Sequence, residues 1–340
     1  MFAAVSGQVS CSTGPWYPSP LDISKYFNVT TNSTCGDPPE PYCVNLGCSK
    51  ICDANDPNLE HPASFVNDDF RDNTFWKSKN LKFPVLPQLG VKGTFMLYQS
   101  VATFFHELPA AMYLLKSNDS GRTWNPLTYF ATNCTKYFNL PETLEKDRAG
   151  LKVQCFKIDT ATNLNKQLSY TPMKDASVAK NLLTDTEKQS FFLMTDIRMA
   201  LVKFIIPGDV DPESLPNSLK RSYFFTVSDW VVLASCFCNG QTSQCDSGNF
   251  SNCICERNTD GPNCEKCLPL YNNKSYQIRE ACEGEHVNVT VMLTAAHTMK
   301  PKDMEFVMIA NTKQQGIRVS SAWRPSTETQ LFHRMPPILV

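Results

Sequence analysis

Residues 236–282 read CFCNGQTSQCDSGNFSNCICERNTDGPNCEKCLPLYNNKSYQIREAC and hold eight of the chain's 15 cysteines. The cysteines follow the spacing C-x-C, six residues, C, seven residues, C-x-C, eight residues, C-x2-C, fourteen residues, C. So few apolar residues separate them that the segment cannot bury a core of its own. Disulfides, each contributing about 2–4 kcal/mol, would hold such a module together. Small disulfide-dense modules are typical of secreted proteins.

Tetrahedral zinc is the alternative for this cluster, because C-x2-C pairs also bind zinc in intracellular proteins. The rest of the chain favours secretion. It carries seven N-x-S/T sequons, each of which would be a surface acceptor for a glycan in a secreted protein. Their asparagines are Asn28, Asn32, Asn118, Asn133, Asn249, Asn273 and Asn288.

The remaining cysteines divide the 340 residues into a large domain and a small module. Seven cysteines precede Ser235 and none follows Cys282. We therefore predict one stapled domain over residues 1–235, the cysteine module over 236–282 and an unassigned tail over 283–340. The tail contains only two short strand-like runs, which are too little for an independent domain.

Charge argues against a nucleic-acid partner, and hydropathy argues against a membrane-spanning segment. Lys plus Arg number 32 against 33 acidic residues, so no global field favours nucleic acid. No apolar run approaches the ~20 residues of a membrane-spanning helix, so we expect no transmembrane segment. The first residues, MFAAVSGQVSC, do not resemble a signal peptide. Because a disulfide-rich chain must be exported, we expect the natural N-terminus to lie upstream and the protein to be secreted.

The central part of the chain reads as strands. Short apolar runs such as GTFMLYQSVATFF and AAMYLLKS alternate with turn signals such as NDSG at residues 118–121. Residues 196–206 place Ile197, Met199 and Leu201 on one face at period two. Short helices are expected only at residues 175–188 and 217–221. A β-sandwich with long loops follows, with Trp76, Trp124 and Trp230 expected in its core.

Motifs of catalysis are lacking. The chain has no G-x-S-x-G nucleophile elbow, Walker loop or Rossmann glycine signature. HELPA at residues 106–110 begins like a zinc-protease motif but lacks the second histidine, and Pro109 would break the required helix. The five histidines share no metal-like spacing. We predict that the protein is not an enzyme and takes no small-molecule substrate; a secreted hydrolase is the minor alternative.

Several motifs occur together in the order of a known family. They are TCGDPPEPYC (34–43), CDANDPNLEHP (52–62), TFWKS (74–78), LPAAMYLLKSNDSGRTWNPLTYFATNC (108–134), LMTDIRMAL (193–201), SYFFTVSDWVV (222–232) and CFCNGQTSQC (236–245). This order resembles the laminin N-terminal domain followed by one laminin-type EGF-like module. The CGDPPExxC loop and the single Trp of TFWKS resemble netrins and netrin-G proteins more than laminin chains. The resemblance implies a jelly-roll β-sandwich followed by a small disulfide-rich module.

The resemblance also implies a disulfide pattern, which spacing alone leaves open among 105 pairings of eight cysteines. In the module it pairs Cys236 with Cys245, Cys238 with Cys253, Cys255 with Cys264 and Cys267 with Cys282. In the large domain it pairs Cys35 with Cys52, Cys43 with Cys48 and Cys134 with Cys155. Cys11 would be unpaired, because its family partner would lie upstream of the sequence.

A structural calcium ion is a further implication of the resemblance. Calcium takes several hard oxygen ligands, including a carboxylate. The matching positions are the Phe65 carbonyl, the Asp68 carboxylate, Thr74 and the Ser228 carbonyl. The loop is shorter than in typical netrins, which leaves Asp69 as an alternative to Asp68, and an acidic surface loop without an ion is the other interpretation.

The function implied is non-enzymatic recognition outside the cell. A netrin or netrin-G type module would bind a cell-surface receptor or adhesion partner in guidance or adhesion. Laminin N-terminal domains associate with each other, so a matrix protein that self-associates is the alternative. We expect partner contacts in the polar, turn-rich residues 133–139, 159–170 and 209–219.

Overall fold

A computed structural model describes residues 18–44, 50–68, 73–143, 152–172 and 186–284. Four residues named above, Cys11, Cys48, Asp69 and Asn288, lie outside these ranges, as does the tail from residue 285. The predictions made for them are therefore not addressed by the structure.

The longest strand, β6 (Gln88–Thr103), organises the β-sandwich. Its first half pairs with β12 (Leu193–Lys203) and β2 (Val29–Thr30). Its second half pairs with β14 (Asp229–Cys236) and β11 (Gln167–Tyr170). β6 therefore joins the strands around β12 to those around β14 in one sheet.

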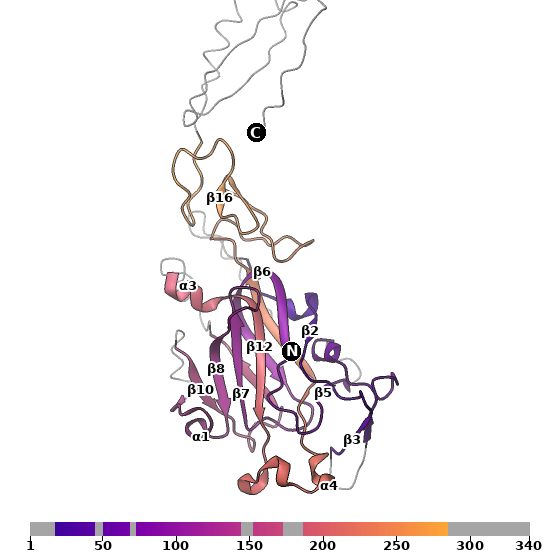
Figure 1. The fold of residues 1–340 in the computed structure, drawn as a ribbon. Coiled ribbons are helices and arrows are strands. Elements are labelled where there is room, and N and C mark those ends of the chain that lie inside the picture. Colours follow the sequence, from indigo (N-terminus) through magenta and orange to yellow (C-terminus); the bar gives the residue numbers. More distant parts are fainter. Residues whose placement is uncertain (1–17, 45–49, 69–72, 144–151, 173–185, 285–340) are drawn as a thin grey trace, which may run out of the picture. The chain divides into compact units, whose positions relative to one another are not determined.

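The strands form a sheet in the order β1-β14-β6-β12-β7-β8-β10-β9, in which β12, β7 and β8 run side by side in Figure 1. The members not yet introduced are β1 (Leu21–Asp22), β7 (Ala111–Ser117), β8 (Asn125–Ala131), β9 (Glu142–Thr143) and β10 (Gln154–Lys157). Two small sheets accompany it, β3 (Glu40–Tyr42) with β4 (Lys50–Cys52) and β5 (Trp76–Lys77) with β13 (Thr226–Val227). The predicted mostly-β sandwich is thus confirmed.

Period-two alternation places the core as predicted on β12. Ile197, Met199 and Leu201 are all fully buried. Trp76 and Trp230 are also fully buried, and the indole N–H of Trp230 donates to Ser100 Oγ at 2.9 Å. The buried Trp therefore finds the polar partner that its ring requires.

Trp124 is not a core residue, and the expectation for it was wrong. It lies in the turn before β8 and is only half-buried, with its N–H bound to Gly121 O at 3.0 Å. The guanidinium of Arg198 lies 3.8 Å from its ring centroid. The turn leads Trp124 onto the outer face of the sheet, where a cation covers one side of the ring.

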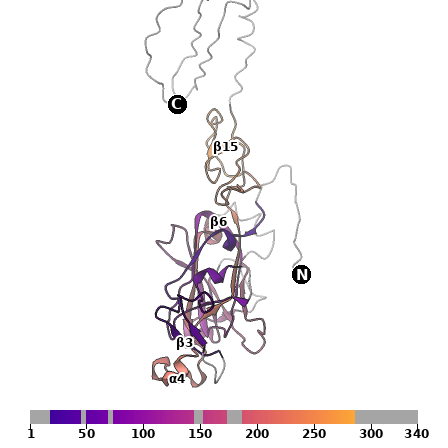
Figure 2. The same cartoon turned by 90° about the vertical axis from the view of Figure 1, so that its right-hand side faces the viewer.

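Helices are short in the described part of the chain. They are α1 (Cys134–Phe138), α3 (Thr186–Phe192), α4 (Asn217–Lys220) and the 3-10 turns η1 (Ile23–Tyr26), η2 (Ala63–Val66), η5 (Pro207–Asp209) and η6 (Pro212–Ser214). α4 matches the helix predicted at 217–221. Of the helix predicted at 175–188, residues 175–185 lie outside the described ranges, and α3 begins at Thr186. Figures 1 and 2 both place β3 and α4 at the same end of the sandwich.

The cysteine module follows β14 without a linker. β14 ends on Cys236, and the Phe237 N–H donates to Thr94 O at 3.1 Å. The module's own strands, β15 (Thr259–Asp260) and β16 (Lys266–Cys267), form a two-stranded ladder. Of the described residues, those up to Cys267 and Tyr276–Ala281 belong to one compact unit, and Leu268–Ser275 with residues 282–284 belong to a second.

Candidate functional site

Disulfides cross-link both the sandwich and the module. The structure joins Cys35 to Cys52, Cys134 to Cys155, Cys236 to Cys245, Cys238 to Cys253 and Cys255 to Cys264. These are pairs that the resemblance implies. Cys267 and Cys282 are also disulfide-bonded.

Cys43 departs from the expected pattern, because the structure gives it a free thiol. Its predicted partner, Cys48, lies outside the described residues. The Cys43 backbone is tied elsewhere, since its N–H donates to Arg221 O at 3.0 Å. Because Cys48 lies outside the described residues, the Cys43–Cys48 disulfide stays a prediction.

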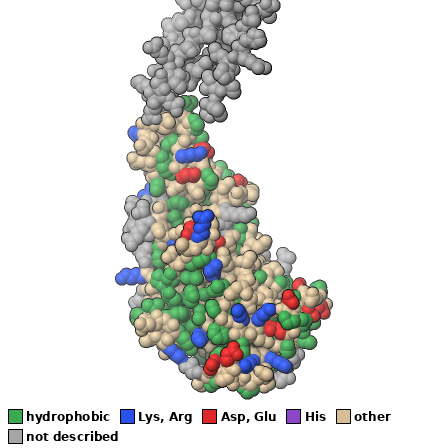
Figure 3. All heavy atoms as spheres, viewed as in Figure 1, with side chains coloured by type: hydrophobic (Ala, Val, Ile, Leu, Met, Phe, Trp, Pro, Cys, Tyr) green, Lys and Arg blue, Asp and Glu red, His purple; other side chains and the backbone are tan. Residues whose placement is uncertain are grey.

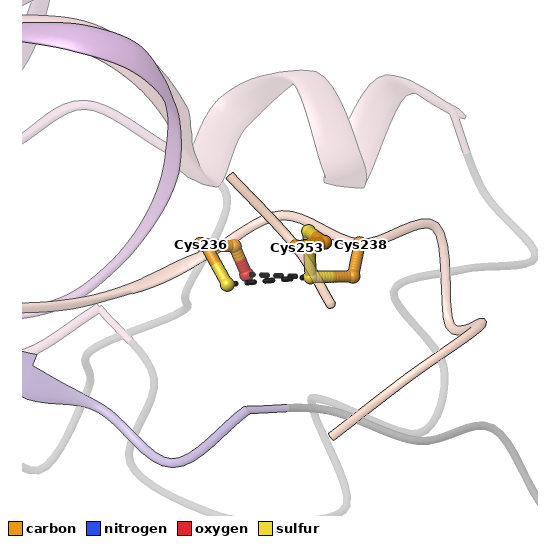
Figure 4. Close-up of side chains that lie close together, drawn as sticks. All are labelled: Cys236, Cys238 and Cys253. Atoms are coloured by element: carbon orange, nitrogen blue, oxygen red, sulfur yellow. Dashed lines mark hydrogen bonds between the residues drawn. A yellow bond between two sulfur atoms is a disulfide. The ribbon is translucent and has the colours of Figure 1, made fainter. Parts of the chain in front are cut away.

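Zinc does not suit the cysteine module. Three of its sulfurs, from Cys236, Cys238 and Cys253, lie within 4.8 Å of one another (Figure 4). All three cysteines are in disulfides, however, and a zinc ligand must be a thiolate. The 3.3 Å approach of the Cys236 and Cys238 Sγ atoms is a close sulfur contact, because neither atom carries a proton.

Two of the predicted calcium residues, Asp68 and Thr74, are hydrogen-bonded to each other just before β5. The Thr74 hydroxyl donates to Asp68 Oδ2 at 2.5 Å. η2, which contains Phe65, packs against both β5 and β14. In the β5–β13 register Val227 lies opposite Trp76, so the next residue, Ser228, falls opposite Phe75, beside Thr74. The structure thus joins Asp68 to Thr74 directly, and the elements that carry Phe65 and Ser228 adjoin β5.

The donor set at this place fits a hard cation. Asp68 Oδ1 is buried and has no hydrogen-bond partner within the described residues. A buried carboxylate oxygen without a partner is costly, and a cation would satisfy it. The Ser228 hydroxyl donates to Thr103 O at 3.2 Å. The oxygen of Ser228 that could bind a cation is therefore its carbonyl, which is also the atom that the resemblance implies. Carboxylate, hydroxyl and carbonyl oxygens are the ligands that calcium prefers.

A second polar cluster, which the sequence did not predict, surrounds Lys77. Its ammonium lies 2.8 Å from Glu40 Oε1 and 3.0 Å from both Ser78 O and Asn80 Oδ1. The rings of Tyr42 and Phe224 lie 5.0 and 4.6 Å from it. Burial lowers the Lys77 pKa to about 8, while Glu40 opposes this effect. A single lysine in the motif TFWKS gives no sign that it points inward.

His61 adjoins the same cluster as a neutral side chain. Its Nδ1 lies 3.1 Å from Phe75 O and its Nε2 lies 2.9 Å from the Tyr42 hydroxyl. A carbonyl can only accept, so Nδ1 carries the proton and Nε2 accepts from Tyr42. Burial is the main cause that lowers the His61 pKa from 6.5 to about 4.

The HELPA segment forms irregular chain between β6 and β7, without the helix that a zinc-protease motif requires. The His106 ring stacks on Phe224, with centroids 5.3 Å apart. Its surroundings are therefore those of a packed aromatic side chain.

A groove of about 290 Å³ opens beside the loop after β10. Its floor includes Leu108, which is buried, and its rim carries Glu107, Lys166 and Leu164, which is 84% exposed. One of the three predicted contact segments lies here, since Thr160, Asn163, Leu164 and Lys166 of residues 159–170 line the groove. Residues 209–219 do not line it. The third, residues 133–139, forms α1 and does not line it. The sequence missed Glu107, Leu108 and Ile205, because only the β6–β11 pairing brings the loop to them.

Six of the seven sequon asparagines lie in the described part of the chain, and all six are exposed: Asn28, Asn32, Asn118, Asn133, Asn249 and Asn273. Exposure is what a glycan acceptor requires. Within the described ranges, the structure contains no helix long and apolar enough to span a membrane.

A disulfide-bonded β-sandwich that leads directly into a cysteine-rich module defines an extracellular module of laminin N-terminal type. A family model for the laminin N-terminal domain (domain VI) matches residues 16–234, and one for the laminin EGF domain matches residues 236–282. The chain therefore belongs to the laminin N-terminal family.

The chain is similar to netrin-G proteins and to laminin subunits. Netrin-G1 of Mus musculus and netrin-G1 of Homo sapiens are each 32% identical over 305 residues, covering 80% of this chain and 55% of the relative. Laminin subunit gamma-1 of Homo sapiens is 28% identical over 283 residues, covering 76% of this chain and 17% of the relative. The chain thus spans about half the length of the netrin-G1 proteins.

Proposed function

We propose that the protein is a non-enzymatic recognition module that binds a cell-surface receptor or adhesion partner through the groove beside residues 159–166. The observation that carries the proposal is Leu164, an 84% exposed leucine on the rim of a groove with an apolar floor. Apolar anchors framed by polar groups are typical of binding hot spots. Glu107 and Lys166 supply opposite charges that would orient a partner.

The test is binding of the secreted protein to cells of a tissue that expresses its receptor. Leu164→Asp and Lys166→Glu should each weaken binding, Leu164→Asp by about tenfold or more, which corresponds to about 1.4 kcal/mol. Ile254→Asp, a charge placed on an exposed residue of the cysteine module, is the matched control. Equal binding by Leu164→Asp and the unmodified protein would contradict this surface.

Self-association as a matrix protein is the second candidate, and the similarity to laminin subunit gamma-1 favours it. Sedimentation over a concentration series separates the two. A calcium-dependent oligomer would support the matrix function. A monomer that binds cells would support receptor recognition.

We further propose that a calcium ion supports the fold at Asp68, Thr74, Phe65 and Ser228. The buried, unpartnered Asp68 Oδ1 supports this proposal. The ion would neutralise the carboxylate and tie the loop after η2 to the start of β5. Its role would be structural, since the ion would hold loops in place for recognition.

A further inference from the structure

The outer face of strands β12, β7 and β8 carries an aromatic strip. Tyr113 and Leu115 on β7 are half-buried, whereas Met112 and Leu114, which alternate with them, are buried in the core. Tyr129 on β8 lies directly opposite Tyr113, with ring centroids 5.4 Å apart. The strip is therefore the side of the sheet that faces away from the core.

Two aromatic residues from outside the strands extend the strip. Phe138 of α1 lies 4.6 Å from the Tyr129 ring and 6.0 Å from the Tyr113 ring. Trp124, before β8, stacks on Arg198, whose Nη2 donates to Gln88 Oε1 at 2.6 Å. Figure 3 shows hydrophobic side chains gathered over this face of the molecule. We call Tyr113, Tyr129, Phe138, Trp124 and Leu115 the aromatic strip.

The five side chains are half-buried, so each leaves part of its apolar surface for a further contact to cover. The sequons indicate what that is, because Asn118 and Asn133 lie before and after β8, the strand at the centre of the strip. A covalently attached glycan is held at high local concentration beside the face, so weak contacts suffice to keep it there.

The two asparagines differ in how free their amides are. Once its amide is oriented to satisfy its neighbours, Asn118 donates to Leu193 O at 2.5 Å and to Ser117 O at 3.3 Å. Asn133 instead uses only its Oδ1, which accepts from Lys136 N at 2.8 Å and caps α1. Within the described residues its Nδ2 makes no hydrogen bond. A glycan on Nδ2 would therefore leave the α1 cap intact.

Sugar rings are chemically suited to bind the side chains of the aromatic strip. The C–H groups on one face of a pyranose ring carry slight positive charge, and the faces of aromatic rings are negative. Trp124 with Arg198 and Gln88 adds hydrogen-bonding groups farther along β8. The seven residues of β8 extend about 23 Å, so a branched glycan from Asn133 can run along the strand.

We propose that an N-glycan on Asn133 folds back onto the aromatic strip and covers it, so that the glycan forms part of the packed surface of the domain. The occupant is the chain's own glycan, attached through the Asn133-Cys134-Thr135 sequon. This inference is independent of the receptor groove, which involves neither α1 nor the outer face of β7 and β8.

The experiment uses the full chain secreted from mammalian cells and hydroxyl-radical footprinting read by mass spectrometry. Removing the glycan from the folded protein with peptide N-glycosidase should raise oxidation of Tyr129 and Phe138 several-fold. The enzyme converts Asn133 to Asp, which still caps a helix, so the fold is retained. Thr135→Ala should give the same increase, and Thr135→Ser, which keeps the sequon, should not.

Asn249→Gln, which removes a sequon in the cysteine module, is the control and should leave oxidation of the strip unchanged. An Asn133 that carries no glycan in the secreted protein would overturn the proposal. So would unchanged oxidation of Tyr129 and Phe138 after the glycan is removed. Protection that depends on protein concentration would also overturn it, because a second copy of the chain would then be covering the strip.

Discussion

The ammonium of Lys77 lies 2.8 Å from the carboxylate of Glu40, and none of the lysine side chain is exposed. Lys77 belongs to β5 and Glu40 to β3, so the ion pair fixes the β3–β4 hairpin, closed by Cys35–Cys52, to the sandwich. Removing one member of such a pair leaves a buried charge unpaired, which costs more than the pair contributes.

We expect Glu40→Gln to lower the free energy of unfolding by about 3 kcal/mol, because Lys77 stays buried without its counter-charge. Lys77→Met combined with Glu40→Gln should recover much of this loss. Urea denaturation of the three proteins is the measurement. If the double variant is less stable than Glu40→Gln alone, the unpaired ammonium is not the cause of the loss.

Calcium should stabilise the fold through Asp68. At a hundred times its dissociation constant the ion would add about 2.7 kcal/mol to the free energy of unfolding. Thermal melts with calcium and with EDTA should therefore differ for the natural sequence and coincide for Asp68→Asn. Glu213→Gln, an exposed acidic residue of η6, should keep the calcium shift. Identical melts of the natural sequence in calcium and EDTA would contradict the site.

Stability should fall in acid because of His61. Its folded pKa of about 4 is below the unfolded value of 6.5, so between these values the unfolded chain binds a proton that the folded chain does not. The free energy of unfolding should therefore fall as pH drops from 6.5 toward 4, by up to about 3 kcal/mol. When the free energy of unfolding is measured by urea titration at several pH values from 7 to 4, it should fall less steeply with decreasing pH for His61→Phe than for the natural sequence. An equal pH dependence in both proteins would mean that the His61 pKa is not lowered by folding.

Gly36 should tolerate no side chain. Its φ is +103°, and a Cβ there would lie 2.5 Å from the Ala54 nitrogen, which donates to Gly36 O at 3.1 Å. Gly36→Ala should lower the free energy of unfolding by about 1–3 kcal/mol through backbone strain and loss of this hydrogen bond. Gly248→Ala, where a Cβ meets nothing closer than 3.4 Å, is the matched control in the same urea experiment. If the urea midpoint of Gly36→Ala equals that of Gly248→Ala, the backbone around Gly36 can accommodate a side chain and the prediction is wrong.

Local patterns in the sequence determined the class of fold. Cysteine spacing predicted a cross-linked module, period-two apolar runs predicted strands, and the buried face of β12 follows from Ile197, Met199 and Leu201. The order of motifs added the family and its disulfide pairs. These features depend on neighbours along the chain or on covalent bonds, so a linear reading can recover them.

Only the tertiary structure decided where single polar and aromatic side chains point. Lys77 is buried because Glu40 reaches it from a hairpin 37 residues earlier, and Trp124 lies outside the core because its turn leads it onto the outer face beside Arg198. The groove likewise depends on β6 pairing with β11. Each of these outcomes depends on which strands become neighbours, and long-range pairing of that kind leaves no local pattern in the sequence.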